Sequence, residues 1–151
     1  MSQPKHLFPD FLTDRVEPED YASWLKRKAA AHVKRDLKRG FSGVSGENYR
    51  DAIHAAVVRS EGLDAYTGED LDWGRIGEYD NEKSKAGRHA YKASLALLPT
   101  VDHVDASSTS AQFLICAWRT NDAKNDLSLN AFVDLCAKVL RKAGYRVEKK
   151  L

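Results

Sequence analysis

The chain has 151 residues, of which 42% are hydrophobic and 30% are charged, and its formal net charge is +2. These proportions are typical of a soluble globular protein with enough residues for a compact core. No apolar run reaches the length of a membrane span, and the first ten residues lack the pattern of a signal peptide. We therefore expect a cytoplasmic protein without a membrane partner.

Two cysteines, Cys116 and Cys136, stand far apart in the sequence, each within an apolar pattern. This pattern favours reduced thiols in a core over a disulfide bond. Two cysteines also exclude a four-cysteine zinc site, so we expect no structural zinc.

Charges of opposite sign are segregated along the chain. Residues 26–39 contain seven basic side chains and one acidic side chain, whereas residues 61–82 contain eight acidic side chains and one basic. The basic segment favours a surface that contacts phosphates, and its candidate DNA contacts are Lys34, Arg35 and Lys38. A solvated helix face is the plainer interpretation of such a run, and it stays open here.

The first part of the chain, residues 1–61, predicts an N-terminal arm followed by a pair of helices. The first helix is expected to begin at Pro18 and to end before Gly40, because apolar residues recur there at three- and four-residue spacing. The second helix is expected over residues 47–60, with Ser45 as its cap. We expect this part to form a helical extension with a basic face.

The second part, residues 62–151, begins with an acidic, turn-rich region and a predicted helix over residues 82–98. That helix carries Arg88 and Lys92, which are candidate contacts for a phosphate. The last helix of the chain is expected to begin near Asn121 or, after a break, near Ser128. Its apolar positions predict a buried stripe: Leu127, Leu129, Phe132, Val133, Cys136, Val139 and Leu140.

Between these helices the sequence predicts two strands. Asp102 and His103 end an extended segment that follows Pro99, and after a polar link, residues 113–118 form an apolar run rich in β-formers. A helix with Asn121 in its first turn is expected next. The predicted order is strand, strand, helix.

The polar residues of this unit suggest metal-assisted chemistry. Asp102 and Asn121 offer hard oxygen ligands suited to Mg²⁺ or Mn²⁺, and a neutral His103 beside them could take a proton from water. Adjacent strand residues point to opposite faces, so both Asp102 and His103 reach one point only if the strand bends or bulges there. In the plainer alternative they form a turn pair, and Asn121 only caps a helix.

The pattern Asp102-His103, a gap of 17 residues and Asn121-Asp-Ala-Lys124 resembles the HNH endonucleases, whose ββα-metal motif cuts phosphodiester bonds in DNA. The likeness covers about residues 62–140. It implies that His103 is the general base and that Asp102 and Asn121 bind a single Mg²⁺ or Mn²⁺ ion.

Three further positions follow from the same resemblance. Gln112 stands close to where the family has an asparagine that steadies the catalytic histidine, and we expect it to take that role. Asn125, one helical turn after Asn121, could face the metal or its waters, or it could simply cap the helix. Lys124 is expected to contact backbone phosphate or the helix surface.

We therefore expect an α+β protein that is mostly helical, with a ββα-metal core and an N-terminal helical extension. Its expected function is metal-dependent hydrolysis of DNA, with double-stranded DNA as the favoured substrate. Two alternatives stay open: a nucleic-acid-binding protein with an HNH-like fold but no cleavage, and a structural or partner-binding protein. A homodimer also stays open, because one such site cuts one strand.

Overall fold

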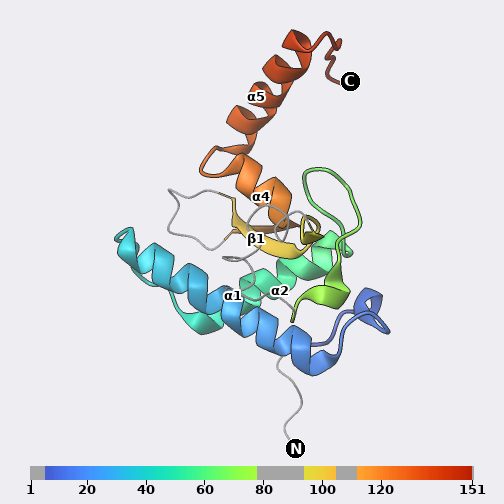
Figure 1. Cartoon of the computed structure of the whole chain (residues 1–151). Coiled ribbons are helices and arrows are strands. Elements are labelled where there is room, and N and C mark those ends of the chain that lie inside the picture. Colours follow the sequence, from blue (N-terminus) through green and yellow to red (C-terminus); the bar gives the residue numbers. More distant parts are fainter. Residues whose placement is uncertain (1–5, 78–93, 105–111, 151) are drawn as a thin grey trace, which may run out of the picture.

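The computed structural model describes residues 6–77, 94–104 and 112–150 (Figure 1). These residues form helices and a two-stranded antiparallel sheet, which confirms the mixed α and β class that the sequence predicts. Most of the helix expected over residues 82–98, with Arg88 and Lys92, lies outside the described residues. Within the described part, none of the helices combines the length and apolar character that a membrane span requires.

Two long helices form the N-terminal part. After a short 3₁₀ turn, η1 (Asp10–Leu12), helix α1 spans Pro18–Lys38 and helix α2 spans Gly46–Ser60. Proline at the start of α1 fits a position whose N–H needs no partner within the helix. The Ser45 side chain accepts a hydrogen bond from the backbone N–H of Asn48, so the predicted cap of α2 is confirmed.

The sheet consists of the two predicted strands. Strand β1 (Pro99–His103) pairs with β2 (Phe113–Ala117), with Pro99 opposite Ala117 and His103 opposite Phe113. The pairing is continuous along both strands, so successive β1 side chains alternate between the two faces. Asp102 and His103 consequently leave the strand in different directions.

Helix α4 (Trp118–Lys124) begins directly after β2, which is earlier than the start near Asn121 that the sequence suggests. Asp64, from the turn-rich region that also contains η2 (Trp73–Arg75), explains this start. Its carboxylate accepts hydrogen bonds from the Ala117 N–H and the Thr120 hydroxyl, both at 2.7 Å. The carbonyls of Leu98 and Ala96 accept hydrogen bonds from the next two N–H groups, those of Trp118 and Arg119. Groups distant in the sequence therefore supply the cap that the local sequence lacks.

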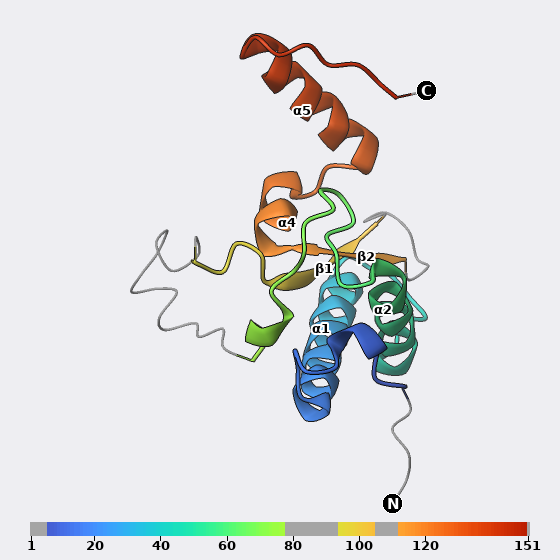
Figure 2. The ribbon, with the colours of Figure 1, turned by 90° about the vertical axis from the view of Figure 1, so that its right-hand side faces the viewer.

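The sheet lies between helices α1 and α2 on one side and helix α4 on the other (Figure 2). One hydrophobic core joins these layers, and it draws side chains from α1, α2, β1, β2 and the turn-rich region. Its largest fully buried members include Trp24, Ile53, Trp73, Phe113 and Ile115. The division of the chain at residue 61 stays a prediction, although both segments contribute to this core.

Helix α5 (Leu129–Lys142) corrects one expectation. The Ser128 hydroxyl caps it, which confirms the predicted break before it. However, within the described helix no side chain is buried, and the expected buried stripe faces outward with Val133 56% and Val139 59% exposed. Figures 1 and 2 show α5 extending away from the other layers. Cys136 is therefore exposed and only Cys116 is a core thiol.

The segment after α5 also differs from expectation. The sequence suggests an edge strand beginning at Tyr145, but the described residues 145–150 contain no strand, and Tyr145 is 65% exposed. An edge strand needs a neighbouring strand with free backbone groups, and α5 carries this segment away from β1 and β2.

Candidate active site

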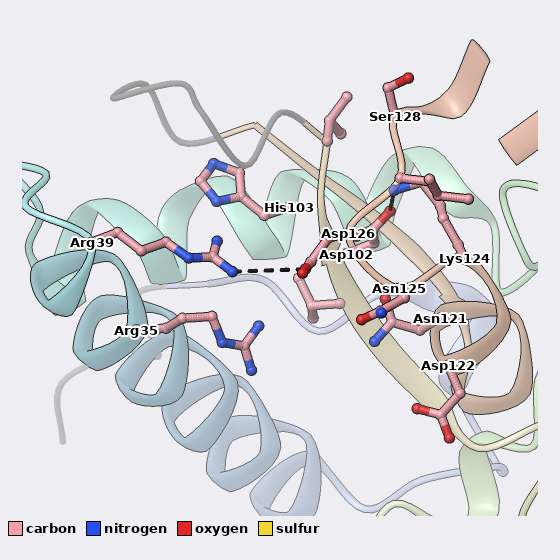
Figure 3. A pocket seen from close by; sticks show the side chains of 13 residues that line it. Arg35, Arg39, Asp102, His103, Asn121, Asp122, Lys124, Asn125, Asp126 and Ser128 are labelled. Carbon is pink, nitrogen blue, oxygen red and sulfur yellow. Dashed lines mark ion pairs between the residues drawn. The ribbon is translucent and has the colours of Figure 1, made fainter. Parts of the chain in front are cut away.

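A cavity of about 690 Å³ brings together most of the described residues that the sequence singled out. Helix α1 lines one wall of it, the end of β1 lines its base, and α4 with the following turn lines the other wall (Figure 3). The lining residues are Arg35, Arg39, Val101, Asp102, His103, Val104, Asn121, Asp122, Lys124, Asn125, Asp126, Leu127 and Ser128.

Asp102 faces α4 and is held there by two partners. Its Oδ2 accepts a hydrogen bond from the Tyr66 hydroxyl at 2.5 Å and lies 3.0 Å from the Lys124 Nζ. Burial and the hydrogen bond to Asp102 raise the pKa of Tyr66, so this phenol stays a donor at neutral pH. Lys124 is only 2% exposed, so its ammonium lies inside the site and not on the outer surface of α4.

His103 faces the helical pair. Its Nδ1 lies 3.3 Å from the Oδ2 of Asp36, a residue of α1 that is completely buried. The His103 ring also packs on Phe113, with the two ring centroids 5.1 Å apart. The two neighbours therefore have different partners on opposite faces of one strand: a phenol and an ammonium for Asp102, and a carboxylate for His103.

The cavity has a positive wall. Arg35 and Arg39 extend from α1 into it, and Figure 3 shows Arg39 directed towards Asp126 on the opposite wall. The closest nitrogen–oxygen distance of that pair is 3.9 Å. Two guanidinium groups that line the same cavity as His103 are suited to binding a phosphate. Lys34 and Lys38, the other predicted basic residues, are exposed on α1 and do not line the cavity.

Asp64 holds the loop that carries Tyr66 into the site. Besides the Ala117 N–H and the Thr120 hydroxyl, it accepts hydrogen bonds from the backbone N–H groups of Tyr66 and Thr67. Burial on its own raises the pKa of Asp64, but these hydrogen bonds outweigh burial and hold the pKa below its ordinary value. Asp64 is therefore ionised at neutral pH and ties the Tyr66 loop to β2 and α4.

Two residues of the cavity carry side-chain oxygens of the kind that bind hard divalent ions. Asp102 provides a carboxylate and Asn121 an amide oxygen, the ligand types that Mg²⁺ and Mn²⁺ prefer. Both described contacts of Asp102, with Tyr66 and Lys124, are made at Oδ2. Among the described residues, no group of three or more His, Cys, Asp or Glu could hold a metal. A metal here would therefore depend on Asn121, on water and on substrate oxygens.

The remaining candidates lie at the rim. Asn125 ends α4 with a positive φ of 52° and lines the cavity. Gln112 is exposed next to β2, and its backbone oxygen accepts a hydrogen bond from the Val104 N–H. The carboxylate that reaches His103 belongs to Asp36, so the expected role of Gln112 as the residue that steadies His103 stays a prediction.

Sequence reasoning missed Asp36, Arg39 and Tyr66. One signal for Asp36 was present: it is the only acid in the basic segment, and it continues the three- and four-residue spacing of the buried positions Leu25, Ala29 and His32. An acid on the buried face of a helix needs a partner.

The chain matches no protein-family model, no curated protein and no solved structure. Any assignment of function therefore depends on the chemistry of the cavity itself.

Proposed function

We propose that this protein is a metal-dependent endonuclease of the HNH type that hydrolyses phosphodiester bonds in DNA. The observation that carries the proposal is the cavity in which Asp102, His103 and Asn121 meet Arg35 and Arg39. A base, two oxygen donors and two cations are groups that can serve phosphodiester hydrolysis. The consecutive β1, β2 and α4 elements support the ββα-metal interpretation of the fold.

In the proposed reaction, His103 takes a proton from a water molecule, and the resulting hydroxide attacks phosphorus in line with the leaving group. The bond to the 3′ oxygen breaks, that oxygen takes a proton from solvent, and the product carries a 5′-phosphate. Arg35 and Arg39 bind non-bridging phosphate oxygens and orient the group for attack. Asp102 and Asn121 would hold the divalent ion, which when bound supplies Lewis-acid stabilisation of the developing charge.

The test is nicking of a supercoiled plasmid with Mg²⁺ or Mn²⁺ and with a chelator. A variant with both Asp102 and His103 replaced by Ala, purified in parallel, reports any contaminating nuclease. We expect metal-dependent conversion to the open circle by the parent and none by the double variant. Equal nicking activity of the parent and the double variant would show that cleavage does not take place in this cavity.

One observation favours a second function, a DNA-binding protein that does not cleave. The buried Lys124 ammonium already compensates the Asp102 carboxylate, so this site is electrostatically satisfied without a divalent ion. In that case the parent binds DNA with a strong dependence on salt but leaves the plasmid intact. A protein that neither cleaves nor binds DNA would instead fit the structural or partner-binding alternative.

A further inference from the structure

We propose that Asp36 is the positioning residue of His103, so that the N-terminal helix pair completes the active site. This inference rests on the proposed nuclease function, in which His103 is the base. The family resemblance looks for this role at residue 112, next to β2. The geometry points to a carboxylate on α1 instead, in the opposite layer of the molecule.

The contact itself is short and buried. The Oδ2 of Asp36 lies 3.3 Å from the Nδ1 of His103, with side-chain exposures of 1% and 4%. The two atoms lie at ion-pair distance but do not have the geometry of a hydrogen bond. Hydrogen bonds of catalytic groups are often long or poorly aligned before substrate binds.

Asp36 is held in place by neighbours on two helices. The Tyr49 hydroxyl of α2 donates a hydrogen bond to the same oxygen, Oδ2, at 2.5 Å. On α1, an Arg39 Nη1 lies 3.9 Å from the other oxygen, Oδ1. A carboxylate fixed from two sides is a rigid reference point for an imidazole.

Aromatic packing restricts the His103 ring further. Phe113, opposite His103 in the hairpin, contacts the rings of His103, His32 and Tyr49 with centroid distances of 5.1, 5.2 and 5.2 Å. Phe113, held between the rings of His32 and Tyr49, therefore packs on one side of the His103 ring. The carboxylate then decides which nitrogen carries hydrogen: a proton on Nδ1, next to Asp36, leaves the lone pair on Nε2 for proton transfer.

A structural ion pair would be the simplest role for a buried acid, but it does not account for the partners of Asp36. Its two closest described partners, Tyr49 and His103, are not fixed cations. Burying a carboxylate against such groups is costly, and the Oδ1 of Asp36 accepts no hydrogen bond from the described residues. Arg35 and Arg39 line the cavity, and Arg39 comes no closer to Asp36 than 3.9 Å.

The experiment measures kcat and KM of plasmid or oligonucleotide cleavage together with the ¹⁵N spectrum of the His103 imidazole. Asp36→Leu removes the acceptor, and Asp36→Asn keeps an acceptor oxygen. Asp36→Leu alone leaves the Tyr49 hydroxyl without its acceptor. The double variant Asp36→Leu with Tyr49→Phe removes that hydroxyl as well, so the test stays possible if the single variant does not fold. Asp20→Asn, an exposed acid at the start of the same helix, is the matched control.

We expect Asp36→Leu, alone or with Tyr49→Phe, to lower kcat by about 10- to 100-fold with little change in KM, because Asp36 orients His103 and is too buried to touch DNA. The ¹⁵N signals are expected to lose the pattern of a ring protonated on Nδ1. Asp36→Asn is expected to lie between Asp36→Leu and the parent, and Asp20→Asn to match the parent.

Parent-like kcat in the folded Leu variants overturns the inference. So does a loss of kcat with an unchanged His103 spectrum, because Asp36 would then act on another group. If the parent itself does not cleave DNA, the proposed function fails. In that case the ¹⁵N spectra still test whether Asp36 orients His103. A parent-like spectrum in the Leu variants refutes this role, and a changed spectrum supports it.

Discussion

The two faces of strand β1 place neighbouring residues in different surroundings. On the α4 face, Asp102 meets a buried ammonium and a phenol from a distant loop. On the α1 face, His103 meets a buried carboxylate and an aromatic ring. The comparison teaches how one dipeptide can reach two environments: a continuous strand sends Asp102, the proposed metal ligand, towards one helix and His103, the proposed base, towards the other. Both still line one cavity at the strand end.

If that division of roles is right, replacing the base and replacing the ligand have different consequences. His103→Ala is expected to lower the cleavage rate by about 10²- to 10⁴-fold, because the imidazole is assigned to proton transfer. Affinity for DNA and for Mn²⁺ is expected to stay as in the parent, as measured by titration. His54→Ala is the control, since this histidine bonds to Tyr21 away from the cavity. Full cleavage activity of His103→Ala would show that His103 is not the base.

The α4 face of strand β1 is tested by replacing Lys124. Lys124→Met leaves the buried Asp102 carboxylate without its ammonium, and we expect the free energy of unfolding to fall by about 3 kcal/mol. Urea denaturation measures this change. Asp102→Asn in the same background removes the stranded charge and is expected to restore part of the stability, as is added Mn²⁺ if Asp102 is a metal ligand. A neutral effect of Lys124→Met would show that the pair does not hold this face together.

The loop that brings Tyr66 to Asp102 can be released at Asp64. Asp64→Asn replaces a buried acceptor of four hydrogen bonds, and we expect a loss of about 2 kcal/mol of stability at neutral pH. Because the folded pKa of Asp64 lies below its ordinary value, its contribution is complete above the unfolded pKa and is lost as pH falls through the folded pKa. Urea denaturation across that acidic range is expected to bring parent and variant together. A stability difference between parent and variant that stays constant as pH falls would contradict the assignment of this pH dependence to Asp64.

The smallest expected effects concern the positive wall of the cavity, formed by Arg35 and Arg39. Arg35→Glu is expected to weaken DNA binding on all sequences alike and to lower the slope of affinity against salt by about 1, because phosphate contacts do not read bases. Lys34→Glu is the matched control on the same helix, exposed but outside the cavity. A larger effect for Lys34 or Lys38 would place the DNA along the outer face of α1. Unchanged DNA affinity in the variants at Arg35, Lys34 and Lys38 would show that the basic face of α1 is only solvated.

Local patterns predicted the elements of the fold well. The proline start of α1, the Ser45 cap, the break before Ser128 and the two strands depend on groups within a few residues of each other, and the structure has all of them. The start of α4 was misplaced for the opposite reason. Asp64, far away in the sequence, supplies the cap at Ala117, and no local pattern reveals such a partner. The bend that would bring Asp102 and His103 to one face of the strand is absent, because β1 and β2 pair continuously.

The sequence by itself determined the candidates for the proposed site, because Asp102, His103 and Asn121 stand out by residue type and spacing. Only the tertiary structure decided what surrounds them: Asp36 and Arg39 come from a helix packed on the other side of the sheet, and Lys124 turns inward to Asp102. It also left the apolar stripe of α5 uncovered. The physical reason is the same in each case, since periodicity shows that a helix has a face but only long-range packing chooses what that face meets.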